Sequence, residues 1–179
     1  MNRNLRIDLG AALMLLASGP VFGLASDSDQ PINLEADWAE RDDVKQTTVY
    51  KGAVVVTQGT MRISGDKVTM HYDDEGEPEK IIVTGKLARF RQRADGADTY
   101  QRAKARRMEF FPKKDLVILV READYSDGQG FKISGERIVY NTVTGNARAA
   151  STASGRPTTK AGKPKGRVKI TIQSKKKKK

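Results

Sequence analysis

The sequence has 179 residues, no cysteine, one histidine and a formal net charge of +11 at pH 7. Without cysteine the chain can form no disulfide, has no thiol nucleophile and lacks the residue on which bacterial lipoproteins are lipidated. A zinc site or a Ser/His/Asp triad would depend on the single histidine. The positive charge belongs to one end of the chain. Residues 26–155 carry 20 basic and 21 acidic side chains, whereas residues 156–179 carry 11 basic and no acidic ones.

Residues 1–25 have the three parts of a secretory signal peptide. A basic start with Arg3 and Arg6 precedes an apolar run from Leu9 to Phe22, and small residues follow. A membrane anchor is the alternative, but the run is shorter than the roughly 20 residues that a spanning helix needs, and Gly19-Pro20 interrupts it. We therefore predict cleavage after Ala25 and a mature protein that is soluble in the periplasm.

The chain from residue 26 to residue 150 reads as strands and turns. Alternating residues begin at Ile32, and a β-rich run from Val49 to Thr57 ends at a Gln58-Gly59 turn. Apolar runs at 81–83, 87–90 and 116–120 lie between polar turns at 73–78, 94–98, 112–115 and 127–130. Residues 103–111 have a composition that favours helix, but their place in the order of elements predicts a strand. Turns at this spacing are typical of a β-sandwich or barrel.

One stretch of this region occurs twice. Met61–Met70 returns 70 positions later as Phe131–Tyr140 without a gap, with Ile, Ser and Gly unchanged and with acid, base and apolar positions largely matched. Each copy alternates apolar and polar residues on both sides of its glycine, as strands with one buried face do. We interpret each copy as two strands joined by a corner at Gly65 or Gly135, and the domain as an internal duplication.

Residues 151–179 are rich in Gly, Pro and Lys and end in five lysines. Such a composition buries too little apolar surface to offset the entropy of the chain, so we predict a disordered basic tail. In an exported protein this tail is expected to meet phosphate groups at a membrane surface rather than nucleic acid. Within it, Val168 to Ile172 alternates, which leaves open a last strand or an adhesive peptide.

Little in the sequence points to catalysis or to a bound metal or cofactor. His71 falls on the outward phase of its strand, where a surface side chain is the simpler interpretation. The acidic loop at 73–79 lacks the glycine spacing of a calcium loop. No nucleophile lies beside a base, and the carboxylates are scattered over turns, so we do not expect an enzyme.

Three segments together resemble a known family. Asp29 to Ile32, Tyr50 to Thr60 and Ile63 to Val68, supported by Gly85 to Phe90, are similar to the LptA (OstA-like) family of bacterial lipopolysaccharide transport proteins. The resemblance covers residues 26–150 and leaves out the tail. It implies an all-β fold, an open, V-shaped β-jelly roll of antiparallel strands whose apolar interior holds the acyl chains of lipopolysaccharide.

The resemblance also implies a function and partners. Such a protein binds lipopolysaccharide and carries it from the inner to the outer membrane in a head-to-tail protein bridge, between an LptC-like inner-membrane component and an LptD-like translocon. Ile32 and Phe90 would line the groove by the family likeness. The alternation of the strands places Val54, Val56, Ile63 and Val68 on the same face. These residues would equally fill a dry core, which leaves open a structural β-sandwich adaptor of the cell envelope without a lipid groove.

The duplication predicts where such domains would join. A sandwich made of two copies leaves an unpaired strand at each end. We expect one free edge near Ile32 to Leu34 and the other near Ile138 to Val143. Both could pair with another domain by strand addition.

Overall fold

A computed structural model of the chain describes residue 27 and residues 30–93, 98–141, 144–156 and 167–173. Their elements form one ten-stranded antiparallel sheet with a short 3₁₀ turn. The elements are β1 (Asn33–Glu35), β2 (Trp38–Asp42), β3 (Thr47–Gln58), β4 (Met61–Tyr72), β5 (Pro78–Arg93), β6 (Tyr100–Phe111), η1 (Pro112–Lys114), β7 (Leu116–Ser126), β8 (Phe131–Asn141), β9 (Ala147–Ala150) and β10 (Lys169–Ile172). The all-β class is thus confirmed, and so is the strand at 103–111, which lies within β6. The predicted signal peptide and most of the turn at 94–98 lie outside the described residues.

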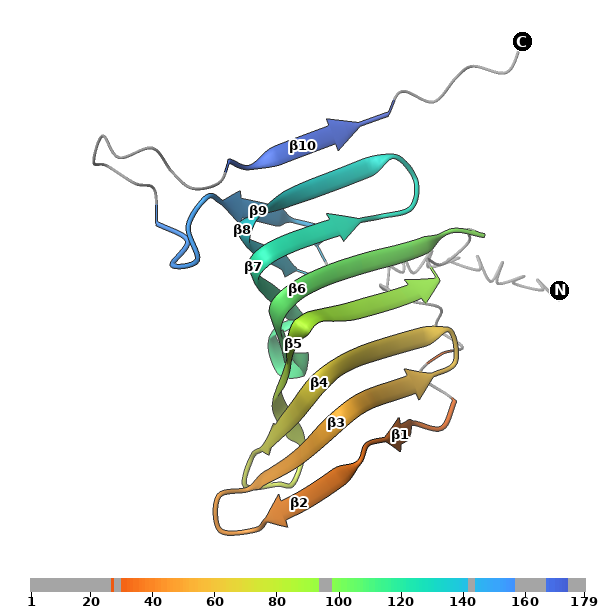
Figure 1. The fold of residues 1–179 in the computed structure, drawn as a ribbon, viewed down its shortest axis with the longest axis vertical. Helices are drawn as coiled ribbons and strands as arrows, with labels where there is room; N and C mark the ends of the chain where they lie inside the picture. The colour runs from red at the N-terminus through yellow and green to blue at the C-terminus, as the bar shows by residue number, and fades with distance from the viewer. Residues whose placement is uncertain (1–26, 28–29, 94–97, 142–143, 157–166, 174–179) are drawn as a thin grey trace, which may run out of the picture.

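The strands stack in chain order along the long axis of the molecule, from β2 at one end to β10 at the other (Figure 1). Strands β3 to β8 form a meander in which each strand pairs with the next. The ends are built from short strands: β1 and β2 both pair with β3, and β9 and β10 both pair with β8. The two copies of the repeated stretch are β4 and β8, so the duplication repeats one strand and its neighbours along the stack.

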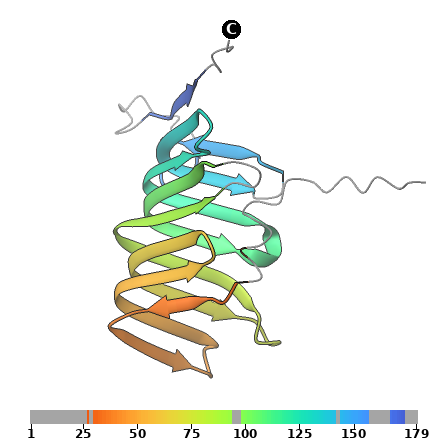
Figure 2. The ribbon, with the colours of Figure 1, turned by 90° about the vertical axis from the view of Figure 1, so that its right-hand side faces the viewer.

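Every long strand bends, and the bends lie side by side. The pairing register shifts between Lys51 and Val54 on β3, and again where β4 meets β5, β5 meets β6, β6 meets β7 and β7 meets β8. β-bulges increase the local twist and turn the strand. Because they are aligned, the sheet folds along one line into two leaves that face each other, and Figure 2 shows the strands bending together along one side. The V-shaped, open arrangement is therefore confirmed.

This bend corrects the interpretation of the repeated stretch as two strands joined by a corner. β4 and β8 run through the bend without interruption, and β5 likewise unites the two apolar runs at 81–83 and 87–90. The repeated glycine is needed for close approach rather than for an unusual backbone angle. A Cβ at Gly65 would lie 2.7 Å from a Val83 methyl and 2.8 Å from the Thr84 carbonyl oxygen, and one at Gly135 would lie 2.9 Å from the Ala150 carbonyl oxygen.

The two ends of the sheet differ from expectation at the C-terminal side. The N-terminal edge near Ile32 to Leu34 is confirmed, since β1 pairs only with β3. The other expected edge, at 138–143, is wrong, because Arg137 to Tyr140 pair with β9 and residues 142–143 lie outside the described residues. The free edges there are β9 and β10. β10 itself lies within the tail expected to be disordered, so for Lys169–Ile172 the alternative of a last strand is the correct one.

The leaves enclose one apolar core. It contains fully buried Val68, Val83, Met108, Leu119 and Ile138, each at most 1 % exposed. These residues recur along successive strands at the bend, so the core is a continuous row rather than a sphere. Within the described residues, no helix has the length and the apolar character needed to cross a membrane.

Candidate functional site: the apolar cleft between the two leaves

A cleft of about 390 Å³ lies between the leaves. Its lining begins at the bend with Val68 and Val83 and extends to the ends of both leaves. The last lining residues are Met61 on one leaf and Pro112 and Leu116 on the other. Side chains on alternate positions of β3 to β8 supply this lining, because successive residues of a strand point to opposite faces. The lining is predominantly apolar, as expected for a site that takes hydrocarbon rather than a charged substrate.

Five of the six predicted lipid-binding residues line this cleft. They are Ile32, Val56, Ile63, Val68 and Phe90. Ile32 is 66 % exposed and lies at the open end of the cleft, before β1 begins. Val54, the sixth, is fully buried and is not among the lining residues. It shares the inward face with Val56 but lies beside the bend, where the register shift buries it against neighbouring strands.

Two aromatic pairs connect the leaves across the interior. Phe90 of β5 and Phe110 of β6 lie with their ring centroids 6.2 Å apart, and Tyr125 of β7 stacks on Tyr140 of β8 at 5.0 Å. In each pair both rings come from after the bend of their strand, and because neighbouring strands are antiparallel the two rings lie on opposite leaves. The pairs therefore make contacts between the two leaves and form part of the lining.

Burial in this interior raises the pKa values of two tyrosines. Burial raises the pKa of Tyr140 to about 12, and burial together with the neighbouring Tyr140 raises the pKa of Tyr125 further still. The Tyr125 hydroxyl lies 3.3 Å from the Gln101 side-chain oxygen, within hydrogen-bond distance. Both phenols remain neutral at every physiological pH, so they add hydrogen-bonding groups to the cleft without adding charge.

The prediction from sequence missed the half of the cleft that the second copy supplies. The 70-residue offset maps Val68 onto Ile138 and Met70 onto Tyr140, and all four residues line the cleft. Applying the offset to the candidate residues would have found them. Phe110 and Leu119 carry no such signal, because their positions depend on where the register shifts.

Polar contacts fix the ends of the leaves. Asp27 accepts hydrogen bonds from the backbone N–H and the hydroxyl of Thr60, at 2.8 and 2.6 Å, and from the Gln92 amide at 3.1 Å. This contact ties the chain before β1 to the β3–β4 turn and to the end of β5. On the other leaf, Lys113 pairs with Asp73, which joins η1 to the β4–β5 turn.

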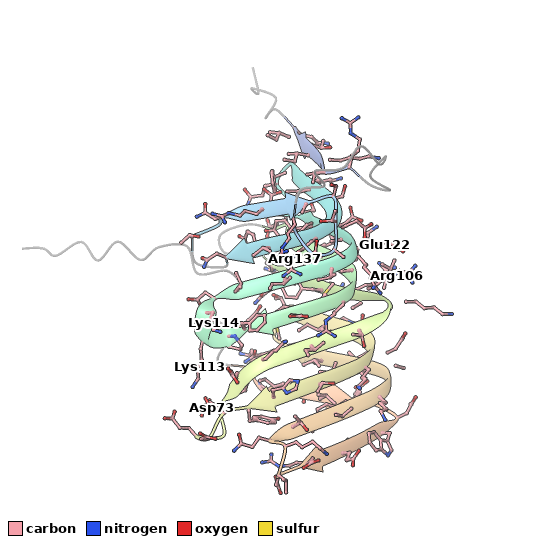
Figure 3. The ribbon with its side chains drawn as sticks, turned by 90° about the vertical axis from the view of Figure 1, so that its left-hand side faces the viewer. Asp73, Arg106, Lys113, Lys114, Glu122 and Arg137 are labelled. Carbon is pink, nitrogen blue, oxygen red and sulfur yellow. The ribbon has the colours of Figure 1, made fainter. Side chains whose placement is uncertain are left out.

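Figure 3 shows that second leaf from outside. Asp73, Lys113 and Lys114 lie on one side of the molecule, and Arg106 and Glu122, which are 2.5 Å apart, lie on the opposite side, along the bend. One ion pair thus joins adjacent strands at the bend and another joins adjacent turns at the open end. Both join neighbouring parts of the leaf, and neither pair involves a residue that lines the cleft.

The described residues show no candidate metal site, and the one histidine faces away from the cleft. Among the described residues, no group of three or more His, Cys, Asp and Glu side chains comes together that could hold a metal ion. His71 lies on β4 directly after the cleft-lining Met70, so it belongs to the opposite face of that strand. The arrangement can bind an apolar chain and shield it from water.

The chain is similar to known proteins in sequence and in structure. Residues 33–146 match the family model described as "LptA/(LptD N-terminal domain) LPS transport protein". The lipopolysaccharide export system protein LptH of Pseudomonas aeruginosa is 33 % identical over 162 residues, which are 90 % of each chain. LptA of Escherichia coli is 34 % identical over 151 residues, covering 83 % of this chain and 80 % of that protein.

A solved structure agrees with these likenesses. The crystal structure of LptH, titled the LptA homologous periplasmic component of the conserved lipopolysaccharide transport device, matches with a TM-score of 0.68 and 33 % identity, over 83 % of this chain and 99 % of that one. A shorter match of 54 residues, 44 % identical, is to the LPS-assembly protein LptD of Vibrio cholerae and covers 6 % of it. The chain belongs to the LptA/LptD N-terminal domain family of lipopolysaccharide transport proteins.

Proposed function

We propose that the protein binds lipopolysaccharide in the periplasm and carries it from the inner to the outer membrane as one unit of a protein bridge. The observation that carries this proposal is the apolar cleft, which both leaves line and which reaches their open ends. The relatives with this fold are named for lipopolysaccharide export, and the structural relative is described as a periplasmic component of that transport device.

Physical chemistry explains why such a carrier needs a cleft. Exposing one twelve-carbon chain to water costs on the order of 9 kcal/mol, at roughly 0.8 kcal/mol per methylene group. A lipid with several chains cannot cross an aqueous space at that cost. An apolar cleft open along one side removes most of it, because the chains pass from one apolar surface to the next while the sugars stay in water.

The ends of the sheet supply the second part of the proposal, which is assembly into a row. Among the described residues, all of the large, exposed apolar side chains belong to the two ends of the strand stack or to the turns beside them. They are Ile32, Trp38 and Val44 at one end and Val168, Ile170 and Ile172 at the other. Together with the free backbone of β2 and β9, they favour head-to-tail pairing between copies by strand addition.

The same edges would join the row to its partners. The match to LptD and the description of the family, which includes the LptD N-terminal domain, support an LptD-like partner at the outer membrane. An LptC-like component at the inner membrane would occupy the opposite edge. In this proposal the protein is a binding and transport component and not an enzyme, since the cleft holds no nucleophile with a base beside it.

A photocrosslinking residue placed in the cleft tests the proposal. At Phe90 it should capture lipopolysaccharide, because the ring lies on the lining. At Thr69, which lies between the lining residues Val68 and Met70 on the opposite face of β4, the same residue should capture none. Equal capture at both positions, or none at Phe90 in a folded protein, would leave the alternative of a structural adaptor whose interior is plain core.

A further inference from the structure

The outer face of one leaf carries two rows of basic side chains. The cross-strand register places Arg62 of β4 opposite Arg91 of β5, and Arg91 opposite Arg102 of β6. In the next row, Arg89 of β5 lies opposite Lys104 of β6. Directly opposed residues on neighbouring strands have their Cβ atoms about 5 Å apart, so the three arginines form an unbroken ladder of like charge.

This ladder has little compensating negative charge among the described residues. Among the ion pairs within the described residues, none involves Arg62, Arg91 or Arg102. The nearest compensation is in the second row, where Lys104 pairs with Asp124 at 3.1 Å. Like charges in direct opposition destabilise a sheet. The three opposed arginines are therefore expected to lower the stability of the fold, so a role in folding does not explain them.

Two of the three arginines are nonetheless held in place. The Tyr100 ring lies 5.5 Å from the Arg91 guanidinium carbon and 5.6 Å from that of Arg102, so one aromatic ring positions both. Along the same strands the surface is hollowed, with a volume of about 550 Å³, and Lys132 of β8 completes the basic lining. Positioned guanidinium groups around a hollow bind planar or tetrahedral oxyanions in a bidentate manner, and phosphate is the usual one.

The position of the ladder relative to the cleft identifies the ligand. Arg62 and Arg102 alternate along β4 and β6 with Ile63 and Ala103, which line the cleft on the other face. Arg62 is the second residue of β4, directly after the β3–β4 turn at the open end of the leaf. A lipid whose chains lie in the cleft would extend its headgroup from the open end, where Arg62 directly follows the lining residue Met61.

We propose that the arginine ladder of Arg62, Arg91 and Arg102 is a binding site for phosphate groups on the headgroup of the lipid whose chains occupy the cleft. This proposal rests on the proposed function and adds to it. The cleft holds the cargo by its hydrocarbon, and the ladder holds it by its phosphate. A cargo that carries phosphate would then be retained longer than an otherwise identical one without it.

The test compares lipopolysaccharide with the same lipopolysaccharide after its phosphates are removed. The wild-type protein should prefer the phosphorylated form by about tenfold. The variant R62Q/R91Q/R102Q should lose the preference yet bind the dephosphorylated form as the wild type does. The control K175Q/K176Q/K177Q removes the same charge from the basic tail and should keep the preference. A variant with lysine at the three arginine positions should keep only part of it, because ammonium groups cannot form the bidentate contact.

The outcomes separate this proposal from the one beneath it. A preference that survives the arginine-to-glutamine changes, or that the tail control loses equally, would overturn the ladder as a site. Displacement of the lipid by inorganic phosphate at low millimolar concentration would assign the ladder to free phosphate instead. A wild-type protein that binds neither lipid would contradict the cleft, and so the proposed function, whatever the arginines do.

A stability measurement gives an independent readout. Because R62Q/R91Q/R102Q relieves repulsion between neighbouring strands, its urea midpoint should rise while its preference for phosphate is lost. A lower midpoint would show that the arginines stabilise the sheet, and it would remove the argument that they are kept for a ligand.

Discussion

Phe90 and Val54 occupy the same inward face of the sheet and have different surroundings. Phe90 lines the cleft and contacts Phe110 across it, whereas Val54 is fully buried beside the bend. A charge at Phe90 can be hydrated from the open side of the cleft, but it removes the apolar surface that a lipid would contact. We therefore expect Phe90→Asp to lower lipopolysaccharide binding at least tenfold and to lower the free energy of unfolding by only about 1–2 kcal/mol.

Val54→Ala is the matched comparison for that experiment. It should cost roughly 1–3 kcal/mol of unfolding free energy, because it leaves a cavity in packed core, while binding per folded molecule stays unchanged. Binding titrations and urea denaturation of both variants measure the two quantities separately. If binding and stability fell together in both variants, Phe90 would be core and the cleft would have no role in binding.

Asp27 makes stability depend on pH at the acid end. Burial raises the pKa of its carboxyl, but hydrogen bonds from Thr60 and Gln92 outweigh burial and lower the pKa below its ordinary value of 3.8. A carboxyl whose pKa is lower in the folded state stabilises the fold above its unfolded pKa, and this contribution is lost as pH falls through the folded pKa.

We therefore expect the stabilities of the wild-type protein and the Asp27→Asn variant to become equal at low pH. At neutral pH, Asp27→Asn should lower the free energy of unfolding by roughly 2 kcal/mol, since the hydrogen bonds from Thr60 then reach a neutral acceptor. Between about pH 5 and pH 2 the wild-type protein should lose this advantage, so that the two stability curves meet. Asp43→Asn, at a carboxylate with an 81 % exposed side chain, is the control with the same charge change and should show a much smaller difference. A gap that stayed constant down to pH 2 would contradict the assignment.

At the scale of elements, the sequence predicts which residues are strands better than it predicts where strands are continuous. Period-two alternation is local, so the inward faces of β3, β4 and β5 follow from it directly. A bulge in mid-strand looks in sequence like a turn between two strands, and for this reason the sequence predicts two strands in place of each of β4 and β5. The register shifts that align the bends depend on neighbouring strands, and no single stretch of sequence encodes them.

β10 also depends on a partner that its local sequence does not reveal. Its alternation at 168–172 is visible in the sequence, but its partner is Phe131 to Ser134 of β8, some 40 residues earlier. Composition alone favoured disorder for these residues, and pairing with a free edge overrides it. The prediction of six cleft residues likewise rests on local alternation. Local phase identified the inward face, and only the bend decides that Val54 is enclosed while Val56 faces the cleft.

Removing the C-terminal segment tests what β10 contributes. Ile170 and Ile172 remain 56 % and 76 % exposed, so deletion of residues 157–179 should leave the β-sheet spectrum and the melting temperature nearly unchanged. It should weaken association with anionic vesicles at low salt, by about 1 kcal/mol per basic residue near the surface, and the difference should vanish at high salt. A loss of folded structure on truncation would show that β10 is part of the core.

A charge-only variant separates the strand from its lysines. Changing Lys175 through Lys179 to glutamine retains β10 and should reproduce much of the salt-dependent effect on vesicles. Only the full truncation uncovers the edge of β8 at Phe131 to Ser134. Self-association, measured by sedimentation, should therefore change in the truncated protein and stay as in the wild type in the glutamine variant.

At the scale of the whole molecule, the sheet of the described residues is open, with an unpaired edge at each end. The strands stack from β2 to β9 and β10, and each end presents free backbone together with exposed apolar side chains. A heterologous contact between unlike ends that does not close a ring continues indefinitely, so the geometry favours an open row. In such a row the clefts of successive copies would meet end to end. Together they would form one continuous apolar path along the row.

Breaking either end should therefore stop the row and leave the domain folded. Trp38 is 42 % exposed on β2 and Ile170 is 56 % exposed on β10, so we expect Trp38→Lys and Ile170→Lys each to weaken self-association by about tenfold, with little change in melting temperature. Thr69→Lys, in the middle of β4, is the control for an added charge away from the ends.

Mixing experiments then test the polarity of the contact. The two variants each keep one intact end, so together they should form dimers through those ends but no longer rows, as sedimentation would detect. Rows that persist when both changes are combined in one chain would contradict head-to-tail assembly through these edges.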